Sequence, residues 1–154
     1  MSSHVTIPLP SEARRPVVAL VAHDGRKEEM AEWAVYNKET LRQCTLFATG
    51  HTGRVLEAHL GVPIHLLLSG AHGGDAQLGS LIAEGRVDVV FFFWDPLTPQ
   101  PHDVDVKALL RLAVLHDVPI ACNRSSADYL ISSPLFGAPA QYRDDRRRAV
   151  ARAG

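Results

Sequence analysis

Residues 17–22 read VVALVA, six apolar residues between Pro16 and the polar run 23–25. An unbroken apolar run of this length, bounded by turn residues, is typical of a strand that is buried on both faces of a parallel sheet. Four further runs of the same kind follow along the chain, at 45–48, 64–68, 87–93 and 118–122. The sequence therefore predicts five strands.

The segments between these runs carry apolar residues at helical spacing. One such helix is expected to begin near Arg26 and to continue through Leu41, and a short one from Arg54 to Leu60 ends at Gly61. Three more are predicted: one that carries Leu78, Leu81 and Ile82 and stops at Gly85, one at 104–115, and one opened by a capping box at Ser125-x-x-Asp128. This alternation predicts an α/β fold, a three-layer Rossmann-like or flavodoxin-like domain with a central five-stranded parallel sheet.

The length of 154 residues fits one domain. We expect a flexible N-terminal arm over residues 1–16, the α/β domain over 17–138, and an Arg-rich C-terminal tail over 139–154 for which a helix is one interpretation. The first 15 residues have no apolar core of the kind that a signal peptide carries, so export is not expected.

The composition excludes several classes of function. Sixteen Lys and Arg against 17 Asp and Glu give a net charge of −1, which does not favour nucleic acid or an anionic membrane as partner. No apolar run approaches the ~20 residues of a membrane-spanning helix. Cys44 and Cys122 form neither a C-x-x-C pair nor a disulfide framework, so we expect buried thiols and a cytoplasmic location.

Polar residues gather where each of the first four predicted strands ends. In parallel sheets, ligands bind at the carboxyl ends of the strands, where the strand order switches. Solvated turns are the alternative explanation, but the number of imidazoles and carboxylates favours a functional site. The residues concerned are His23-Asp24-Gly25-Arg26-Lys27, Thr49-Gly50-His51-Thr52-Gly53, Ser69-Gly70-Ala71-His72-Gly73-Gly74-Asp75, and Asp95 with His102-Asp103-Val104-Asp105.

Two of these loops are typical of anion binding. The loops 49–53 and 69–74 are rich in small residues and run straight into helices, whose free amides and positive dipole end favour an anion. Lys27 can supply a counter-charge. Neither loop has the ending of a P-loop or the dinucleotide-binding pattern, so a nucleotide cofactor is not expected. Helix capping and turn geometry alone would also explain each loop.

Two pairs of an imidazole and a carboxylate share the same spacing: His72 with Asp75, and His102 with Asp105. Such pairs could bind a divalent metal, but the spacing matches no strong zinc signature. A surface histidine and a helix cap at Asp75 are the plain alternatives. A carboxylate near an imidazole and an anion site is a known arrangement for proton transfer, which makes these residues candidates for catalysis.

Together these segments resemble the methylglyoxal synthase family. The resemblance covers roughly residues 16–136, in order and with the family's spacing. Regulatory domains of carbamoyl phosphate synthetase and the cyclohydrolase part of the bifunctional purine enzyme share the fold but lack the full Asp and His set. The motifs that carry it are Val21-Ala22-His23-Asp24, Ala48-Thr49-Gly50 with Thr52-Gly53, Ser69-Gly70-x-x-Gly73-Gly74-Asp75, Phe92-Phe93-Trp94-Asp95-Pro96-Leu97, and His102-Asp103-x-Asp105 continuing to Leu112.

The resemblance implies a lyase without metal or cofactor that converts dihydroxyacetone phosphate to methylglyoxal and inorganic phosphate. Asp75 matches the catalytic base, His102 the group that polarises the carbonyl and contacts substrate, and Asp105 with Asp24 its carboxylate support. His51 stands where the family usually has a hydroxyl residue, and its backbone amide is expected to contact phosphate. The other phosphate and substrate contacts map onto His23, Lys27, Thr49, Gly50, Thr52, Ser69 and Gly70.

The resemblance also implies a homohexamer that phosphate inhibits. The family ordinarily closes with a Pro-Asp-Tyr segment and an arginine that reaches a neighbouring subunit, whereas this chain has Gln141-Tyr142-Arg143 followed by Arg146-Arg147-Arg148. Two alternatives stay open at this point: a non-catalytic module on the same fold that senses a phosphate ligand, and a metal-dependent phosphatase.

Overall fold

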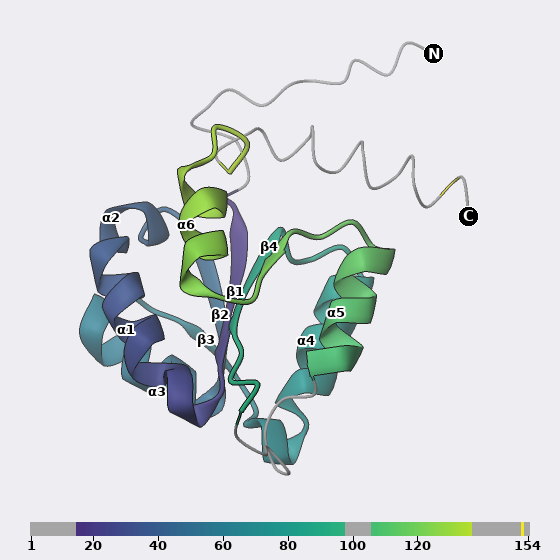
Figure 1. The fold of residues 1–154 in the computed structure, drawn as a ribbon, viewed down its shortest axis with the longest axis horizontal. Coiled ribbons are helices and arrows are strands. Elements are labelled where there is room, and N and C mark those ends of the chain that lie inside the picture. The colour runs from purple at the N-terminus through teal and green to yellow at the C-terminus, as the bar shows by residue number, and fades with distance from the viewer. Residues whose placement is uncertain (1–14, 98–105, 137–151, 153–154) are drawn as a thin grey trace.

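The structure, a computed structural model, describes residues 15–97, 106–136 and 152. Its centre is a five-stranded parallel sheet with the strand order β3-β2-β1-β4-β5 (Figure 1). The predicted five-stranded parallel sheet is therefore confirmed. The strands are β1 (Val17–Ala22), β2 (Thr45–Thr49), β3 (His65–Leu67), β4 (Val89–Phe93) and β5 (Ile120–Ala121).

Helices cover both faces of the sheet, which gives the three layers seen in Figure 1. One face is covered by α1 (Lys27–Tyr36), α2 (Lys38–Leu41), α3 (Gly50–Leu60) and α6 (Arg124–Ser132), and the other by α4 (Gly74–Ala83) and α5 (Val106–Leu115). Two short 3-10 turns, η1 (Asp24–Arg26) and η2 (Gly70–His72), follow β1 and β3. Among the described helices, none has the length and apolar character needed to cross a bilayer.

The strands are buried on both sides, and successive residues serve opposite cores. Leu20 of β1 belongs to the cluster under α1, α3 and α6, whereas its neighbour Val21 belongs to the cluster under α4 and α5. In β4, Phe91 lies 4.7 Å from the ring of Trp33 in α1, and Phe92 belongs to the opposite cluster. This alternation follows from the period of two in a strand and explains why the runs are apolar throughout.

Three local predictions differ from the structure. The first helix is interrupted at Asn37, whose side-chain amide donates to the carbonyl of Trp33 at 2.9 Å. Helix α3 begins at Gly50 and not at Arg54. The predicted capping box at Ser125 is wrong, because α6 is capped by Asn123, whose side chain accepts a hydrogen bond from the Ser126 amide at 2.9 Å.

The order of the strands places a switch point between β1 and β4. The chain adds β2 and β3 on one side of β1 and then crosses to β4 on the other. The carboxyl ends of β1 and β4 thus diverge into helices on different faces, which is where α/β sheets bind ligands. The predicted arm over 1–16 and tail over 139–154 fall almost wholly outside the described residues, so the domain boundaries stay predictions.

Candidate functional site

His23 joins the tips of β1 and β4 at the switch point. Its backbone amide donates to the carbonyl of Phe93 at 3.1 Å, and its Nδ1 accepts from the amide of Asp95 at 3.0 Å. The imidazole is buried, with its ring edge-on to Phe92 at 5.1 Å between centroids. Because Nδ1 accepts this bond, the neutral ring carries its proton on Nε2, which is therefore a donor.

Asp95, which the sequence places among the polar residues at the strand ends without a catalytic or binding role, approaches the turn after β1 closely. A methyl group at Gly25 would lie only 2.5 Å from Asp95 Oδ2, so the close approach depends on glycine. Asp95 Oδ1 accepts from the amide of Leu97 at 3.1 Å. The available signal was its position directly after β4, since that is where the ends of neighbouring strands converge.

The start of α3 holds a buried donor that has no hydrogen-bond partner among the described residues. Thr49 occupies the N-cap position, but its side chain makes no capping hydrogen bond. Thr52, in the first helical turn, is only 2% exposed. Its Oγ1 is the single buried side-chain polar atom without a hydrogen-bond partner in the part of the chain that the structure describes. A buried unpartnered hydroxyl beside free helix amides is an arrangement that an anion would satisfy.

The turn after β3 lies against the start of α3. The amide of Gly50 donates to the carbonyl of Leu68 at 3.4 Å. A methyl group at Gly50 would lie 3.3 Å from the amide nitrogen of Ser69. The turns at Thr49 and Ser69 are therefore neighbours on the same rim of the sheet, as a single anion site requires.

The Ser69 turn is fixed by its own hydrogen bonds. The amides of His72 and Gly74 both donate to the carbonyl of Ser69, at 3.0 and 2.9 Å. Ser69 Oγ and His72 Nδ1 are hydrogen-bonded at 2.8 Å. Gly73 has a φ of 100°, a conformation that favours glycine.

This turn delivers Asp75 to the first turn of α4. The N-cap of α4 is Gly73, so the alternative that Asp75 is the cap residue is wrong. The carboxylate is half-buried, and its Oδ1 accepts from the amide of Ala76 at 3.0 Å. A methyl group at Gly74 would lie 1.8 Å from the carbonyl oxygen of Leu68, so the position of Asp75 depends on glycine before it.

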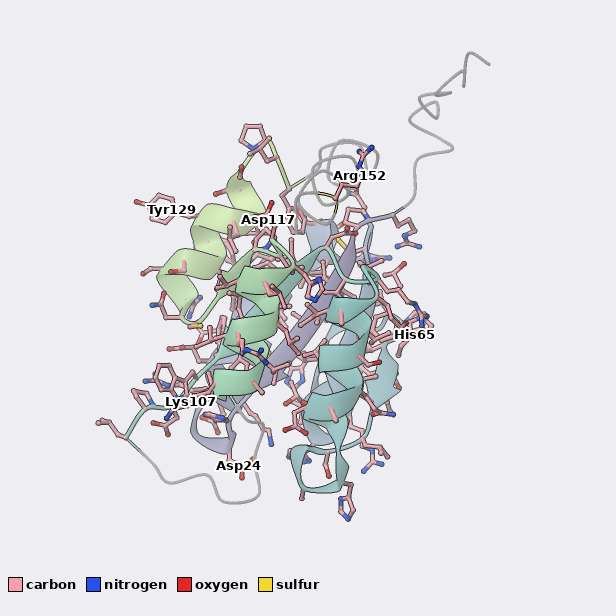
Figure 2. The ribbon with its side chains drawn as sticks, turned by 90° about the vertical axis from the view of Figure 1, so that its right-hand side faces the viewer. Asp24, His65, Lys107, Asp117, Tyr129 and Arg152 are labelled. Atoms are coloured by element: carbon pink, nitrogen blue, oxygen red, sulfur yellow. The ribbon has the colours of Figure 1, made fainter. Side chains whose placement is uncertain are left out.

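Asp24 and Lys27 form an ion pair directly after β1. The hydrogen bond and the charge of Lys27 hold the pKa of Asp24 below its usual value, against the opposing effect of burial. The charges of His51 and His23 make smaller contributions in the same direction. The Lys27 side chain is 17% exposed and that of Asp24 81%. Figure 2 shows Asp24 at one end of the domain, where β1 ends.

A groove of about 800 Å³ runs between α1 and α3 from this ion pair. His51 lines it together with Asp24 and Lys27, so residues after β1 and after β2 share one hollow. A smaller hollow of about 220 Å³ lies at the ends of β4 and β5, and Trp94 and Cys122 are among the residues that line it. Burial raises the pKa of the Cys122 thiol. The remaining lining residues of the groove are Glu28, Ala31, Glu32, Val35, Val55 and His59.

The structure brings together most of the predicted rim. His102 and Asp105 lie outside the described residues, between Leu97 and Val106, and their places stay predictions. Within the described ranges, no group of three or more His, Cys, Asp or Glu side chains could hold a metal ion. The predicted residues that follow three adjacent strands are His23, Asp24 and Lys27 after β1, Thr49, Gly50, His51 and Thr52 after β2, and Ser69, Gly70 and Asp75 after β3.

Known proteins are similar to this chain in sequence and in fold. A family model described as an MGS-like domain matches residues 29–122. A methylglyoxal synthase of Leptospira interrogans is 56% identical over 119 residues, which cover 77% of this chain and 80% of that protein. The chain belongs to the methylglyoxal synthase family. The methylglyoxal synthase of Pectobacterium atrosepticum is 52% identical over 124 residues, or 80% of this chain and 82% of that protein.

Solved structures agree with this family assignment. The crystal structure of methylglyoxal synthase from Elizabethkingia anophelis matches with a TM-score of 0.78 and 46% identity, over 80% of this chain and 82% of that one. The MGS-like domain model covers the Thr49 and Ser69 turns and Asp75, whereas Asp24 and Lys27 precede its first matched residue.

Proposed function

We propose that this chain converts dihydroxyacetone phosphate to methylglyoxal and inorganic phosphate. The observation that supports this most directly is the pair of adjacent turns at Thr49 and Ser69, with the buried Thr52 hydroxyl that has no partner among the described residues. Membership of the methylglyoxal synthase family supports a phosphate ester as the ligand of this anion site.

The proposed phosphate contacts come from both turns. The hydroxyl of Thr52 and the amide of His51 would donate from the start of α3, with Gly50, whose own amide donates to the Leu68 carbonyl, beside them. The dipole of this helix adds to their attraction for a dianion. Ser69 and Gly70 would donate from the other turn. Thr49 and His23 would add polar contacts to the phosphate, and Lys27 would add a positive charge.

Asp75 is the proposed base that removes a proton from the carbon next to the ketone. The resulting enediolate carries charge on oxygen, and donors aimed at that oxygen contribute strongly to such reactions. We assign that role to His102, with Asp105 and Asp24 as the carboxylates that orient it. A carboxylate base is repelled by a nearby dianion, while hydrogen bonds such as that from the Ala76 amide favour its ionised form.

The anion site must also control the torsion of the leaving group. Elimination of phosphate requires the breaking carbon–oxygen bond to overlap the π system of the enediolate. This overlap exists only when the bond lies out of the enediolate plane. Isomerisation follows when this bond lies in the plane. Two turns that bind the phosphate from different strands can fix that torsion. Such positioning can lower an activation barrier by several kcal/mol, up to about 7 to 11 kcal/mol.

We propose further that the chain forms a homohexamer in the cytoplasm, that phosphate inhibits it, and that it supplies a bypass of glycolysis. These proposals follow from the resemblance to the family. An arginine of the C-terminal tail, such as Arg143, is a candidate for reaching the phosphate site of a neighbouring subunit.

The test is to incubate the purified full chain with dihydroxyacetone phosphate and to measure both released phosphate and the dicarbonyl product. We expect turnover without added metal and equal turnover after chelation. Loss of turnover on chelation would favour a metal-dependent phosphatase. Tight phosphate binding by calorimetry with no turnover would favour a non-catalytic sensing module instead, and would refute the proposal.

A further inference from the structure

We infer that the imidazole of His51 makes anion binding at the start of α3 depend on pH, so that the site holds a phosphate group more tightly when this ring is protonated. The inference rests on the proposed function and adds a regulation to its phosphate site. It concerns a side chain to which the proposed mechanism gives no role, since only the backbone amide of His51 takes part there.

His51 lies next to the donors that define the anion site. It is the second residue of α3, which has 11 residues, and it directly precedes Thr52, whose buried Oγ1 has no partner among the described residues. Thr49 does not cap the free amides of this turn. The His51 side chain is exposed, so its ring can turn toward a bound anion without displacing the core.

Other charged and titratable groups surround His51, and three of them already form ion pairs. Across the groove lie Asp24 and Lys27, which pair with each other, and Glu32, which pairs with Arg124 at 3.4 Å. Glu28 also faces the groove from α1, and His59 lies farther along the same helix. His23, buried at the end of β1, is the remaining titratable neighbour. The charge of His51 helps to lower the pKa of Asp24, so it acts across this groove.

The position gives protonation and anion binding a reason to be coupled. A cation at a helix N-terminus is opposed by the helix dipole. A bound dianion reverses that effect, because it attracts both the dipole and the imidazolium. Histidine is the side chain that ordinarily changes charge between about pH 5 and 8. Anion binding should therefore take up protons at this residue, and protonation should strengthen anion binding by the same factor.

Calorimetry with sulfate tests the inference without any turnover. Sulfate stays a dianion over the range used, so a change in affinity reports on the protein. Between about pH 5.5 and about pH 8.5 we expect the wild-type affinity to fall about two- to five-fold. His51→Gln keeps a polar side chain but no titratable charge, and should lose most of this dependence.

His59→Gln is the matched control. It removes an imidazole from the same groove, but eight residues farther along α3, which is about 12 Å at 1.5 Å per residue. We expect it to keep the wild-type pH dependence. Thermal unfolding of both variants near the wild-type temperature would show that they fold.

Proton uptake gives a second readout on the same samples. Calorimetry in buffers of different ionisation enthalpy should find a fraction of a proton taken up per sulfate by the wild type near neutral pH, and less by His51→Gln. Equal pH dependence and equal uptake in both proteins would overturn the inference, as would a wild type that binds no sulfate. Failure of the lyase assay alone leaves these binding results intact, so the two proposals can fail separately.

Discussion

Gly74→Ala should damage both the fold and the site, because the added methyl group has no room. Its Cβ would lie 1.8 Å from the carbonyl oxygen of Leu68 and 2.8 Å from the carbonyl carbon. Ordinary contact begins at about 3.4 Å, so about 1.6 Å must be made up by movement of backbone on one side or the other. Overpacking of this kind costs roughly 1 to 3 kcal/mol or more.

The same movement reaches the proposed base. Asp75 is the next residue, and a misplacement of about 1 Å at a reacting group can lower the rate about 100-fold. Urea unfolding and the release of phosphate from dihydroxyacetone phosphate measure the two effects. Gly61→Ala is the control: Gly61 has a φ of 64° but no atom within 4 Å of the added methyl, so we expect a loss of about 1 kcal/mol and normal turnover. Wild-type stability and turnover in Gly74→Ala would refute the reasoning.

Three further predictions address single contacts. Thr52→Val replaces a buried hydroxyl that has no partner among the described residues with a group of similar shape. The ligand-free variant should therefore unfold at the same or a higher urea concentration than wild type, while its sulfate affinity falls about ten-fold. A lower unfolding midpoint with unchanged sulfate binding would contradict this. Asn123→Ala should lower the unfolding free energy by about 1 kcal/mol because the α6 cap is lost, whereas Ser125→Ala should lower it much less. A larger loss for Ser125→Ala than for Asn123→Ala would indicate that Ser125 caps the helix instead. The pKa of Asp24 is lowered in the folded state, so the stability that its carboxylate contributes is present above its unfolded pKa near 3.8 and is lost as pH falls through the folded value. The difference in unfolding free energy between wild type and Asp24→Asn, measured with urea, should therefore shrink toward zero on acidification. A difference that grows at low pH would show that the sign is wrong.

The fold could be predicted because its deciding signals are local. The run at 17–22 is apolar on both sides, since Leu20 and Val21 each face a separate helical layer. A strand exposed on one face would have alternated instead. Once five such runs alternate with helices, the parallel sheet and the position of the functional rim follow from general rules of connection.

The details that sequence reasoning missed depend on competition between neighbours or on distant contacts. Gly50 and Gly53 have low helix propensity, so the sequence predicted that α3 begins at Arg54. In the structure the helix begins at Gly50, where the Gly50 amide donates to the Leu68 carbonyl of the turn after β3. Asn123 and Ser125 both suit a cap, and only the helix position decides between them. The approach of Asp95 to Gly25 joins segments 70 residues apart, which no local pattern encodes.

The candidate site was predicted in part for the same reasons. Loops after neighbouring strands had to meet, and the Thr49 and Ser69 turns do so. The unpartnered state of the Thr52 hydroxyl depends on what surrounds it in three dimensions, so the residue type alone could not show it. The roles of His102 and Asp105 stay predictions.

The central claim is that the anion site and Asp75 belong to one catalytic centre, and the Asp75→Asn variant tests it most directly. Phosphate binding and phosphate release from dihydroxyacetone phosphate should be measured on the same preparation, next to wild type. We predict that Asp75→Asn still binds inorganic phosphate but releases none from the substrate above background. Turnover by this variant at the wild-type rate would contradict the account.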